Sequence, residues 1–291
     1  MRAGAATLGG MPRRLHALGR VALTSALCAT TGFAVTVFGG SSAPASLVLP
    51  TTAPGLTGAG LALLPRQSAA STPSLPSLPP INEPWLSDNW SGYAVTGSGL
   101  HSVTGSWVVP AVQASPSPAY SATWIGLDGF SSTDPWLIQV GTEQDAPGRY
   151  SAWWSTSYHE QPIGEPVYPG DAVWVDIHQV AGTTWVVSMG DSSEGWGFSL
   201  SVVYDGPGQS AEWVEEAPTV NGQTATLAQF APVTFDLTTV NGSNPLLLPV
   251  DAGIMHPPGS TLPAAVPSLA DLDTDGFSVA YGAVPPLPPS S

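Results

Sequence analysis

Two side chains of this sequence combine a chemically useful group with an apolar setting. Gln139 interrupts the run WLIQVGTEQD (136–145), whose Trp, Leu, Ile and Val residues are typical of a short buried strand. Its amide both donates and accepts hydrogen bonds, so a glutamine buried there needs partners or a function. Glu212 lies beside a tryptophan in a second run, SAEWVEEAP (210–218). Desolvation in such a strand shifts the pKa of a carboxyl group, which makes Glu212 a candidate general acid or base.

The spacing of the three glutamates in the second run predicts which of them share a face. Side chains alternate along an extended strand, so Glu212 and Glu216 lie on the same face as Val214. Glu215 then lies on the opposite face, together with Trp213. The alternative is that all three glutamates are solvated charges at the edge of a sheet, and the residues alone leave both interpretations open.

Several other kinds of reactive site are excluded by the sequence. Its five histidines form no HExxH motif or clustered metal-ligand spacing, and there is no GxSxG motif or Gly-rich phosphate loop. The segment DLDTDG (271–276) resembles the start of a calcium-binding loop. The twelfth position of that loop is Gly282, where a bidentate glutamate is required, so we interpret the segment as a turn.

Charge is distributed very unevenly along the chain. All 21 Asp and Glu residues follow residue 80, whereas Arg149 is the only basic residue after that point, which gives this part a formal net charge of −20 at pH 7. Such a surface repels nucleic acid and anionic membranes, and it also repels itself. Protonation toward pH values of about 4 relieves that repulsion, which favours a protein that acts in acid. A general solubility bias is the alternative.

The N-terminus has the pattern of a secretory signal peptide over residues 1–45. Arginines precede the apolar run VALTSALCATTGFAVTVF (21–38), and Ala43-Pro44-Ala45 offers small residues at cleavage spacing. An uncleaved membrane anchor is the competing interpretation, which the Thr, Ser and Gly content of the run weakens. The only cysteine, Cys28, lies inside the run, so we expect a secreted, extracellular protein without disulfide bonds.

The rest of the chain divides by composition. Residues 46–84 are rich in Pro, Ser, Thr, Ala and Leu, which is typical of a linker, a stalk or a propeptide. Residues 85–284 contain eleven short β-rich runs separated by Gly, Pro, Asn and Asp, with no helix-length amphipathic segment. This pattern predicts an all-β sandwich of two large sheets. Residues 285–291 are expected to form a flexible tail.

One of these runs, AVWVDIHQV (172–180), shows the alternation clearly. Val173, Val175 and Ile177 are apolar, and the alternate positions hold Trp174, Asp176 and His178. A polar and aromatic outer face on a large sheet is a suitable place for a groove that binds an extended ligand.

Eight short motifs in the β-rich region resemble, in the same order, those of the glutamic peptidases, the eqolisin or peptidase G1 family, and most closely its bacterial members. They are NWSGY (89–93), GSWVVP (105–110), TWIGLDG (123–129), IQVGTE (138–143), YSAWW (150–154), YPGD (168–171), SAEWVEEAP (210–218) and LAQFAPVTF (227–235). The resemblance covers roughly Asn89 to Tyr281, and the order of all eight motifs makes it specific.

The resemblance implies a fold and a mechanism. Members of this family are secreted, acid-acting endopeptidases with a concanavalin A-like sandwich of two antiparallel sheets. Matching the motifs places the catalytic glutamine at Gln139 and the catalytic glutamate at Glu212. Glu212 would activate a water and later protonate the leaving amine, while Gln139 would orient the water and stabilise the oxyanion. This mechanism needs no metal and no cofactor.

The same resemblance implies that Trp124, Asp128 and Trp153 bind the substrate or brace its cleft. The alternatives are that the tryptophans belong to the core and that Asp128 shapes a turn. Ser155 departs from the family, which usually has an acidic residue shortly after the AW pair, so the side-chain preference of the cleft is open. The expected partners are protein or peptide substrates of a monomer, with no nucleic acid and no stable membrane association after signal cleavage.

Two other functions are compatible with a β-sandwich. A carbohydrate-binding module is one, because 11 tryptophans are available to stack on sugar rings. A glycoside hydrolase is the other, and a retaining one requires two carboxyl groups about 5 to 5.5 Å apart. Glu212 and Glu216 would lie about 13 Å apart on an extended strand, so this pair is unsuitable, although a partner from another strand stays possible.

Overall fold

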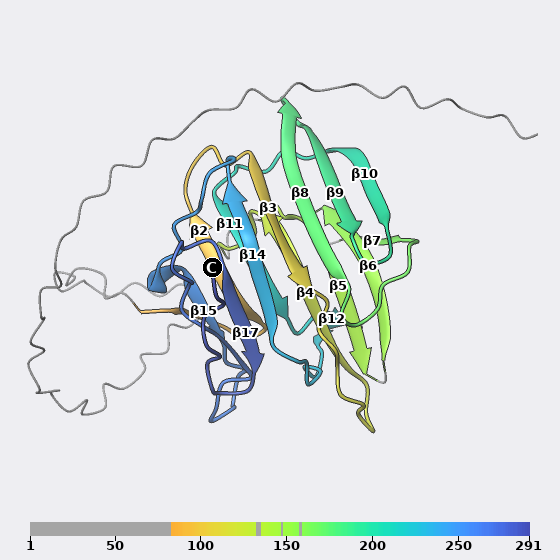
Figure 1. Ribbon diagram of the computed structural model, residues 1–291, viewed down its shortest axis with the longest axis vertical. Coiled ribbons are helices and arrows are strands. Elements are labelled where there is room, and N and C mark those ends of the chain that lie inside the picture. Colours follow the sequence, from red (N-terminus) through yellow and green to blue (C-terminus); the bar gives the residue numbers. More distant parts are fainter. Residues whose placement is uncertain (1–82, 132–134, 147, 157–158) are drawn as a thin grey trace, which may run out of the picture. The chain divides into compact units, whose positions relative to one another are not determined.

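The computed structural model of the protein describes residues 83–131, 135–146, 148–156 and 159–291. The predicted signal peptide and nearly all of the predicted linker lie outside these ranges, so both stay predictions. The described chain forms 17 strands and one short 3-10 helix, η1 (Pro249–Asp251), with no α-helix (Figure 1). No helix within the described ranges is long and apolar enough to cross a membrane.

Six strands form a first layer, which carries both candidate catalytic residues. In spatial order they are β2 (Trp90–Thr96), β11 (Ser210–Glu216), β4 (Ala119–Leu127), β5 (Ile138–Ala146), β6 (Arg149–Thr156) and β7 (His159–Ile163). Every neighbouring pair in this layer is antiparallel. β7 ends the order and contains Pro162, which an edge strand tolerates because proline has no backbone N–H to donate.

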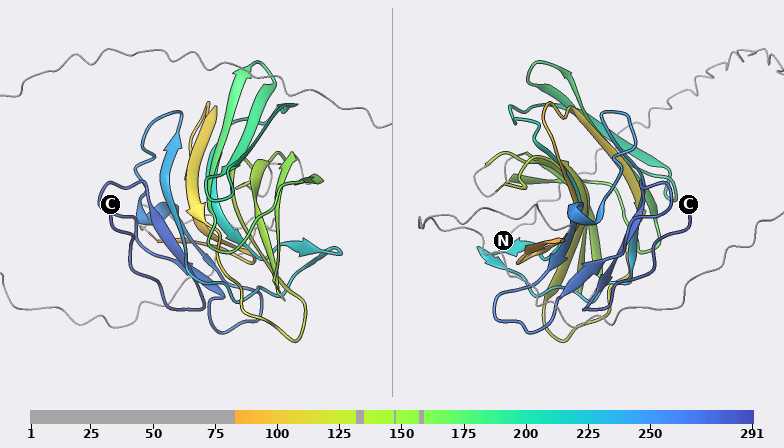
Figure 2. Two further views of the ribbon diagram at one scale, coloured as in Figure 1. Left: turned by 45° about the vertical axis from the view of Figure 1, so that its right-hand side comes forward. Right: turned by 90° about the vertical axis from the view of Figure 1, so that its left-hand side faces the viewer.

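A second layer faces the first, and the two are seen as separate layers in Figure 2. Its strands, in spatial order, are β10 (Trp196–Val203), β9 (Thr184–Asp191), β8 (Ala172–Ala181), β3 (Ser102–Val108) and β14 (Val233–Val240). Three short strands continue the hydrogen bonding from β14 to β2, namely β17 (Phe277–Tyr281), β16 (Ala265–Pro267) and β15 (Ala252–Met255). β1 (Trp85–Ser87) pairs with β15 in parallel, and β12 (Thr219–Val220) and β13 (Gln223–Thr224) form a separate hairpin.

The alternation predicted for residues 172–180 is confirmed in β8. Val173, Val175 and Ile177 face the core and are at most 2% exposed, whereas Trp174 is 42% exposed on the outer face. β8 belongs to the second layer, so its polar and aromatic outer face is not the face that carries Gln139 and Glu212.

Aromatic side chains fill the space between the layers. The Trp213 indole of β11 donates a hydrogen bond to the Thr104 carbonyl of β3, 2.9 Å away in the opposite layer. In the second layer, the Phe235 ring packs between those of Trp107 and Phe277, with centroid distances of 5.9 and 5.1 Å. Because each buried aromatic residue removes a large apolar area from water, these contacts account for much of the stability of the sandwich.

The prediction of an all-β antiparallel sandwich is confirmed, with one difference in its construction. The two layers are parts of one continuous hydrogen-bonded sheet that folds over through β17, β16 and β15. The sequence did not indicate β15 and β16, because strands of four and three residues are too short to show alternation. Residues 285–291 contain no strand or helix, and their predicted flexibility stays a prediction.

Candidate active site

The strand register brings Gln139 and Glu212 into one row across three strands. Glu212 of β11 is paired with Gly126 of β4, and Gly126 is paired with Gln139 of β5. Residues directly opposite in antiparallel strands point to the same face, so both side chains project from one side of the layer. Two strand spacings place their α-carbons about 10 Å apart, with only a glycine between them.

Gly126 lies between the two side chains and has no side chain of its own. A β-carbon at this position would lie 2.8 Å from the Ile138 carbonyl oxygen, 3.0 Å from the Trp124 ring and 3.2 Å from the Gln139 β-carbon. A side chain at position 126 would therefore collide with its neighbours between the glutamine and the glutamate. The glycine lets the Trp124 ring and the adjacent strand approach closely at this position.

The glutamates of β11 are not solvated edge charges, so that alternative is wrong. β11 lies between β2 and β4, and Glu212 and Glu215 are both 0% exposed. The Trp213 indole reaches the opposite layer, which places Trp213 and its alternation partner Glu215 on the core side. Glu212 and Glu216 consequently share the outer side of the layer, as the spacing predicts.

Glu216 holds the indole of Trp124 beside Gly126. The Trp124 Nε1–H donates to one carboxylate oxygen at 2.8 Å, and the Asn89 side-chain amide donates to the other at 3.0 Å. Burial raises the pKa of Glu216 to about 7, against the opposing effect of these hydrogen bonds. The Trp90 ring packs edge-on against the Trp124 ring at a centroid distance of 5.0 Å, which fixes the indole further.

Trp153 and Ser155 of β6 extend the same face beyond Gln139. Ser155 is paired with Gln139 and Trp153 with Gly141, so both point to the side that carries Gln139. Trp153 is 5% exposed and Ser155 is 1% exposed. The Trp153 Nε1, the Ser155 Oγ and the Gln139 Oε1 atoms are buried without a hydrogen-bond partner among the described residues. Buried polar atoms are normally paired, so three unpaired atoms on one face are unusual.

Asp128 occupies a different environment from the two tryptophans. It follows the last residue of β4 with φ of 68°, and it is 0% exposed. Its carboxylate accepts hydrogen bonds from the Tyr204 hydroxyl and from the backbone N–H groups of Gly208 and Gln209. The side chain therefore binds the loop before β11, and direct contact with a substrate stays a prediction without support from these bonds.

Further carboxyl groups lie on the same face as Gln139, and the sequence did not single them out. Glu143 is four residues after Gln139 in β5, so alternation places both on one side. Desolvation raises the pKa of Glu143, and the negative charges of Glu160 and Asp145 raise it further. Burial likewise raises the pKa of Glu160, with Asp145 contributing. The period of two that identified the faces of β11 would have found Glu143 in the same way.

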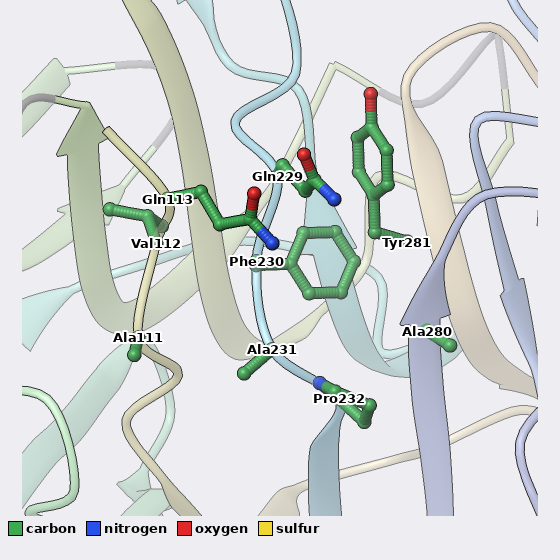
Figure 3. A pocket seen from close by; sticks show the side chains of 9 residues that line it. All are labelled: Ala111, Val112, Gln113, Gln229, Phe230, Ala231, Pro232, Ala280 and Tyr281. Carbon is green, nitrogen blue, oxygen red and sulfur yellow. The ribbon is translucent and has the colours of Figure 1, made fainter. Parts of the chain in front are cut away.

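Two further features of the structure involve none of the five predicted site residues. Three carboxylates, of Asp236, Asp271 and Asp275, have oxygen atoms within 4.8 Å of one another. The Asp271 carboxylate accepts the backbone N–H groups of Asp275 and Gly276 at 3.2 Å, which supports the interpretation of this segment as a turn. A cavity of about 460 Å³ lies elsewhere, between residues 111–113, 229–232 and 280–281, around the ring of Phe230 (Figure 3).

Comparison with known proteins gives the family. Residues 88–257, more than half of the chain, match the Peptidase A4 family. The chain belongs to this family. The peptidase is 25% identical over 197 residues to aspergillopepsin-2 of Aspergillus niger, a match that covers 58% of this chain and 70% of that protein.

Solved structures agree on the fold. The peptidase resembles scytalido-glutamic peptidase with a transition state analog inhibitor, with a TM-score of 0.57 and 20% identity over 67% of this chain and 98% of that one. It also resembles SCP-B, a member of the eqolisin family solved with the tripeptide Ala-Ile-His, with a TM-score of 0.54, 21% identity and the same coverage of both chains. Together with the match to the Peptidase A4 family, this fold confirms the expected peptidase of the eqolisin family, a glutamic endopeptidase.

Proposed function

We propose that this peptidase cleaves peptide bonds in proteins through Glu212 and Gln139, and that it does so in acid after secretion. The observation that carries the proposal is the row formed by Glu212, Gly126 and Gln139. It holds a carboxyl group and an amide on one face, with a glycine between them that contributes no side chain.

Each group has a defined role in the reaction. The Glu212 carboxylate takes a proton from a water molecule as the water oxygen bonds to the carbonyl carbon of the substrate. The carbonyl π electrons move to its oxygen, and the Gln139 amide N–H donates a hydrogen bond to that oxyanion. The tetrahedral intermediate then collapses as Glu212 returns its proton to the amide nitrogen, the C–N bond breaks, and the amine leaves. Both side chains end in their starting state.

The residue types suit catalysis at low pH. An amide carries no titrating proton, so Gln139 keeps donating its hydrogen bond in acid, where a second carboxyl group would change its protonation. A carboxyl group can act as base and then as acid at a pH near its own pKa.

Acid action is also supported by carboxyl groups other than that of Glu212. Burial raises the pKa of Glu215 to about 8, so this core carboxyl group is neutral under acidic conditions. The strongly negative region after residue 80 loses most of its self-repulsion under the same conditions. Secretion is supported by the signal-peptide pattern of residues 1–45.

Peptide substrates fit the surface that surrounds the dyad. Trp124 and Trp153 are 0% and 5% exposed, so they form the buried apolar base of that face, and polar atoms of Trp153 and Ser155 have no hydrogen-bond partner among the described residues. SCP-B, which shares the fold, was solved with the tripeptide Ala-Ile-His. We propose that a substrate strand lies across this face, with its scissile carbonyl above Gly126.

The test is cleavage of acid-denatured haemoglobin by the purified peptidase between about pH 2 and 7, with pepstatin and EDTA present. Glu212→Gln and Gln139→Ala are expected to lose cleavage while retaining the β-sheet circular dichroism of the unchanged protein. Glu165→Gln is the matched control, because it removes a carboxyl group from an exposed position. Wild-type rates in either dyad variant would refute the proposed mechanism, and cleavage restricted to neutral pH would refute acid action.

A further inference from the structure

Asp128 has a backbone conformation that needs an explanation. Its φ of 68° lies in the left-handed region, and the following Gly129 has φ of 87°. A glycine adopts this conformation freely, whereas a residue with a side chain does so only where surrounding contacts hold it. Such conformations are concentrated at functional sites. Asp128 is two residues beyond Gly126, which lies between Glu212 and Gln139 in the row across β11, β4 and β5.

The hydrogen bonds to the Asp128 carboxylate come from one loop, residues 204–209, which joins β10 to β11. The Tyr204 hydroxyl donates to Oδ2 at 2.8 Å and the Gly208 N–H donates to the same oxygen at 3.1 Å. The Gln209 N–H donates to Oδ1 at 2.6 Å. Successive backbone N–H groups that converge on one anion form a concave binding site for it, so the loop is built around this carboxylate.

Two glycines allow the loop to close so tightly. A β-carbon at Gly206 would collide with both the Asp128 Oδ2 atom and the ring of Tyr204. Gly208 has φ of 62°, which a side chain would strain. The sequence of this loop is therefore matched to a carboxylate at position 128.

The loop continues directly into the strand that carries Glu212. The Asp128 N–H donates to the Ser210 carbonyl at 2.9 Å, and Glu212 follows two residues later. On the other side, Leu127 is paired with Ile138, the residue before Gln139. Asp128 thus lies where the chain segments leading to both members of the dyad meet.

The opposite side of the loop is held by backbone bonds alone. The N–H groups of Gly97 and Leu100 donate to the carbonyls of Gln209 and Gly208, at 2.8 and 3.0 Å. These bonds anchor the loop to the turn between β2 and β3. The Asp128 carboxylate provides the side-chain hydrogen bonds on the side toward β4.

We propose that Asp128 is a positioning residue for the hydrolytic reaction: its carboxylate clamps the 204–209 loop and thereby sets the position of Glu212 relative to Gly126 and Gln139. The inference rests on the proposed role of Glu212. It assigns Asp128 to the catalyst and not to the substrate, because its carboxylate oxygens are occupied by the loop.

The experiment compares kcat and KM of the full-length peptidase and its variants on one peptide substrate, well below each unfolding temperature. Asp128→Asn keeps the shape but leaves one acceptor oxygen for three donors, and kcat is expected to fall about tenfold or more with KM within about twofold. Tyr204→Phe removes one donor and is expected to lower kcat by a smaller factor in the same manner. Asp205→Asn is the matched control, since it removes an exposed carboxyl group from the same loop.

Each outcome separates the alternatives. A raised KM at unchanged kcat would mean that Asp128 binds substrate, and a lowered melting temperature with unchanged kcat would mean a purely structural role; both overturn the inference. If Asp128→Asn does not fold, Tyr204→Phe decides by the same criterion. Glu212→Gln is measured alongside: if it stays active, the proposed function fails, whereas if it is inactive and Asp128→Asn has the wild-type kcat, only this inference fails.

Discussion

Replacing Glu215 by glutamine is expected to change the pH dependence of stability in a predictable way. Glu215 is 0% exposed on the core side of β11. Its Oε2 accepts a hydrogen bond from the Thr123 hydroxyl at 2.6 Å, whereas its Oε1 has no hydrogen-bond partner among the described residues. The side chain is therefore well accommodated as a neutral carboxylic acid and poorly accommodated as an anion.

The size of the effect follows from the shifted pKa. Burial raises the pKa of Glu215 from an ordinary value of 4.5 to about 8. Between these values the folded state holds a proton that the unfolded state has released, so the free energy of unfolding falls by about 1.4 kcal/mol per pH unit. The stabilisation is complete below pH 4.5 and is lost as the pH rises to about 8, a total of roughly 5 kcal/mol.

Glu215→Gln removes the ionisation and keeps an acceptor for Thr123. We expect its free energy of unfolding to lie within about 1 kcal/mol of the unchanged protein at pH 4 and to exceed it by several kcal/mol at pH 8. Urea denaturation followed by circular dichroism at both pH values measures the difference. Exposed Glu165→Gln controls for the loss of one negative charge. Equal differences at pH 4 and pH 8 would show that Glu215 does not titrate as its burial requires.

Three further outcomes follow from the site and the second layer. Gly126→Ala places a methyl group between Glu212 and Gln139, against the Trp124 ring, so peptide cleavage should fall about a hundredfold while circular dichroism keeps its β-sheet signal; wild-type cleavage would show that the spacing at position 126 does not matter for catalysis. Trp124→Phe removes the donor to Glu216 and should cost about 1 to 3 kcal/mol of stability in urea at acidic pH, and no loss would mean that the bond is dispensable. Burial raises the pKa of Asp171 and Asp191 raises it further, so the free energy of unfolding falls as the pH rises. Asp191→Asn should make that decline shallower, and an unchanged slope would exclude the interaction of Asp171 with Asp191 as its cause.

The sequence predicted the parts of the site that depend on local pattern. The period of two in β11 assigned Glu212 and Glu215 to opposite faces, and the structure agrees. The pairing of Glu212 with β4 could not be predicted in this way, because its partner Gly126 is 86 positions earlier in the chain. Register between strands so distant depends on the packing of the whole sandwich, and no local pattern encodes it.

The tryptophans show a second limit of the sequence. Their number suggested a surface for sugars, yet Trp107, Trp185 and Trp213 are at most 2% exposed and belong to the core. An aromatic residue on a sandwich strand serves either face equally well by propensity, so composition alone does not separate core from ligand surface. The role of Asp128 was hidden for the same reason, since its partners in the 204–209 loop are about 80 residues away.

The continuous sheet joins the two layers on one side only. Strands β17, β16 and β15 connect them by backbone hydrogen bonds, whereas β7 and β10, at the two ends of the strand order, have one neighbour each. Opening between the layers beside β7 and β10 breaks side-chain contacts, among them the Trp196 indole bond to the Pro166 carbonyl, while opening at the joined side also breaks the backbone bonds of the sheet. The two layers are thus joined by backbone hydrogen bonds at one side and not at the other. We expect local opening of the sandwich to expose β7 and β10 first. For an enzyme that cuts polypeptides, we expect β7 and β10 to be the first segments at which one molecule is cut by another.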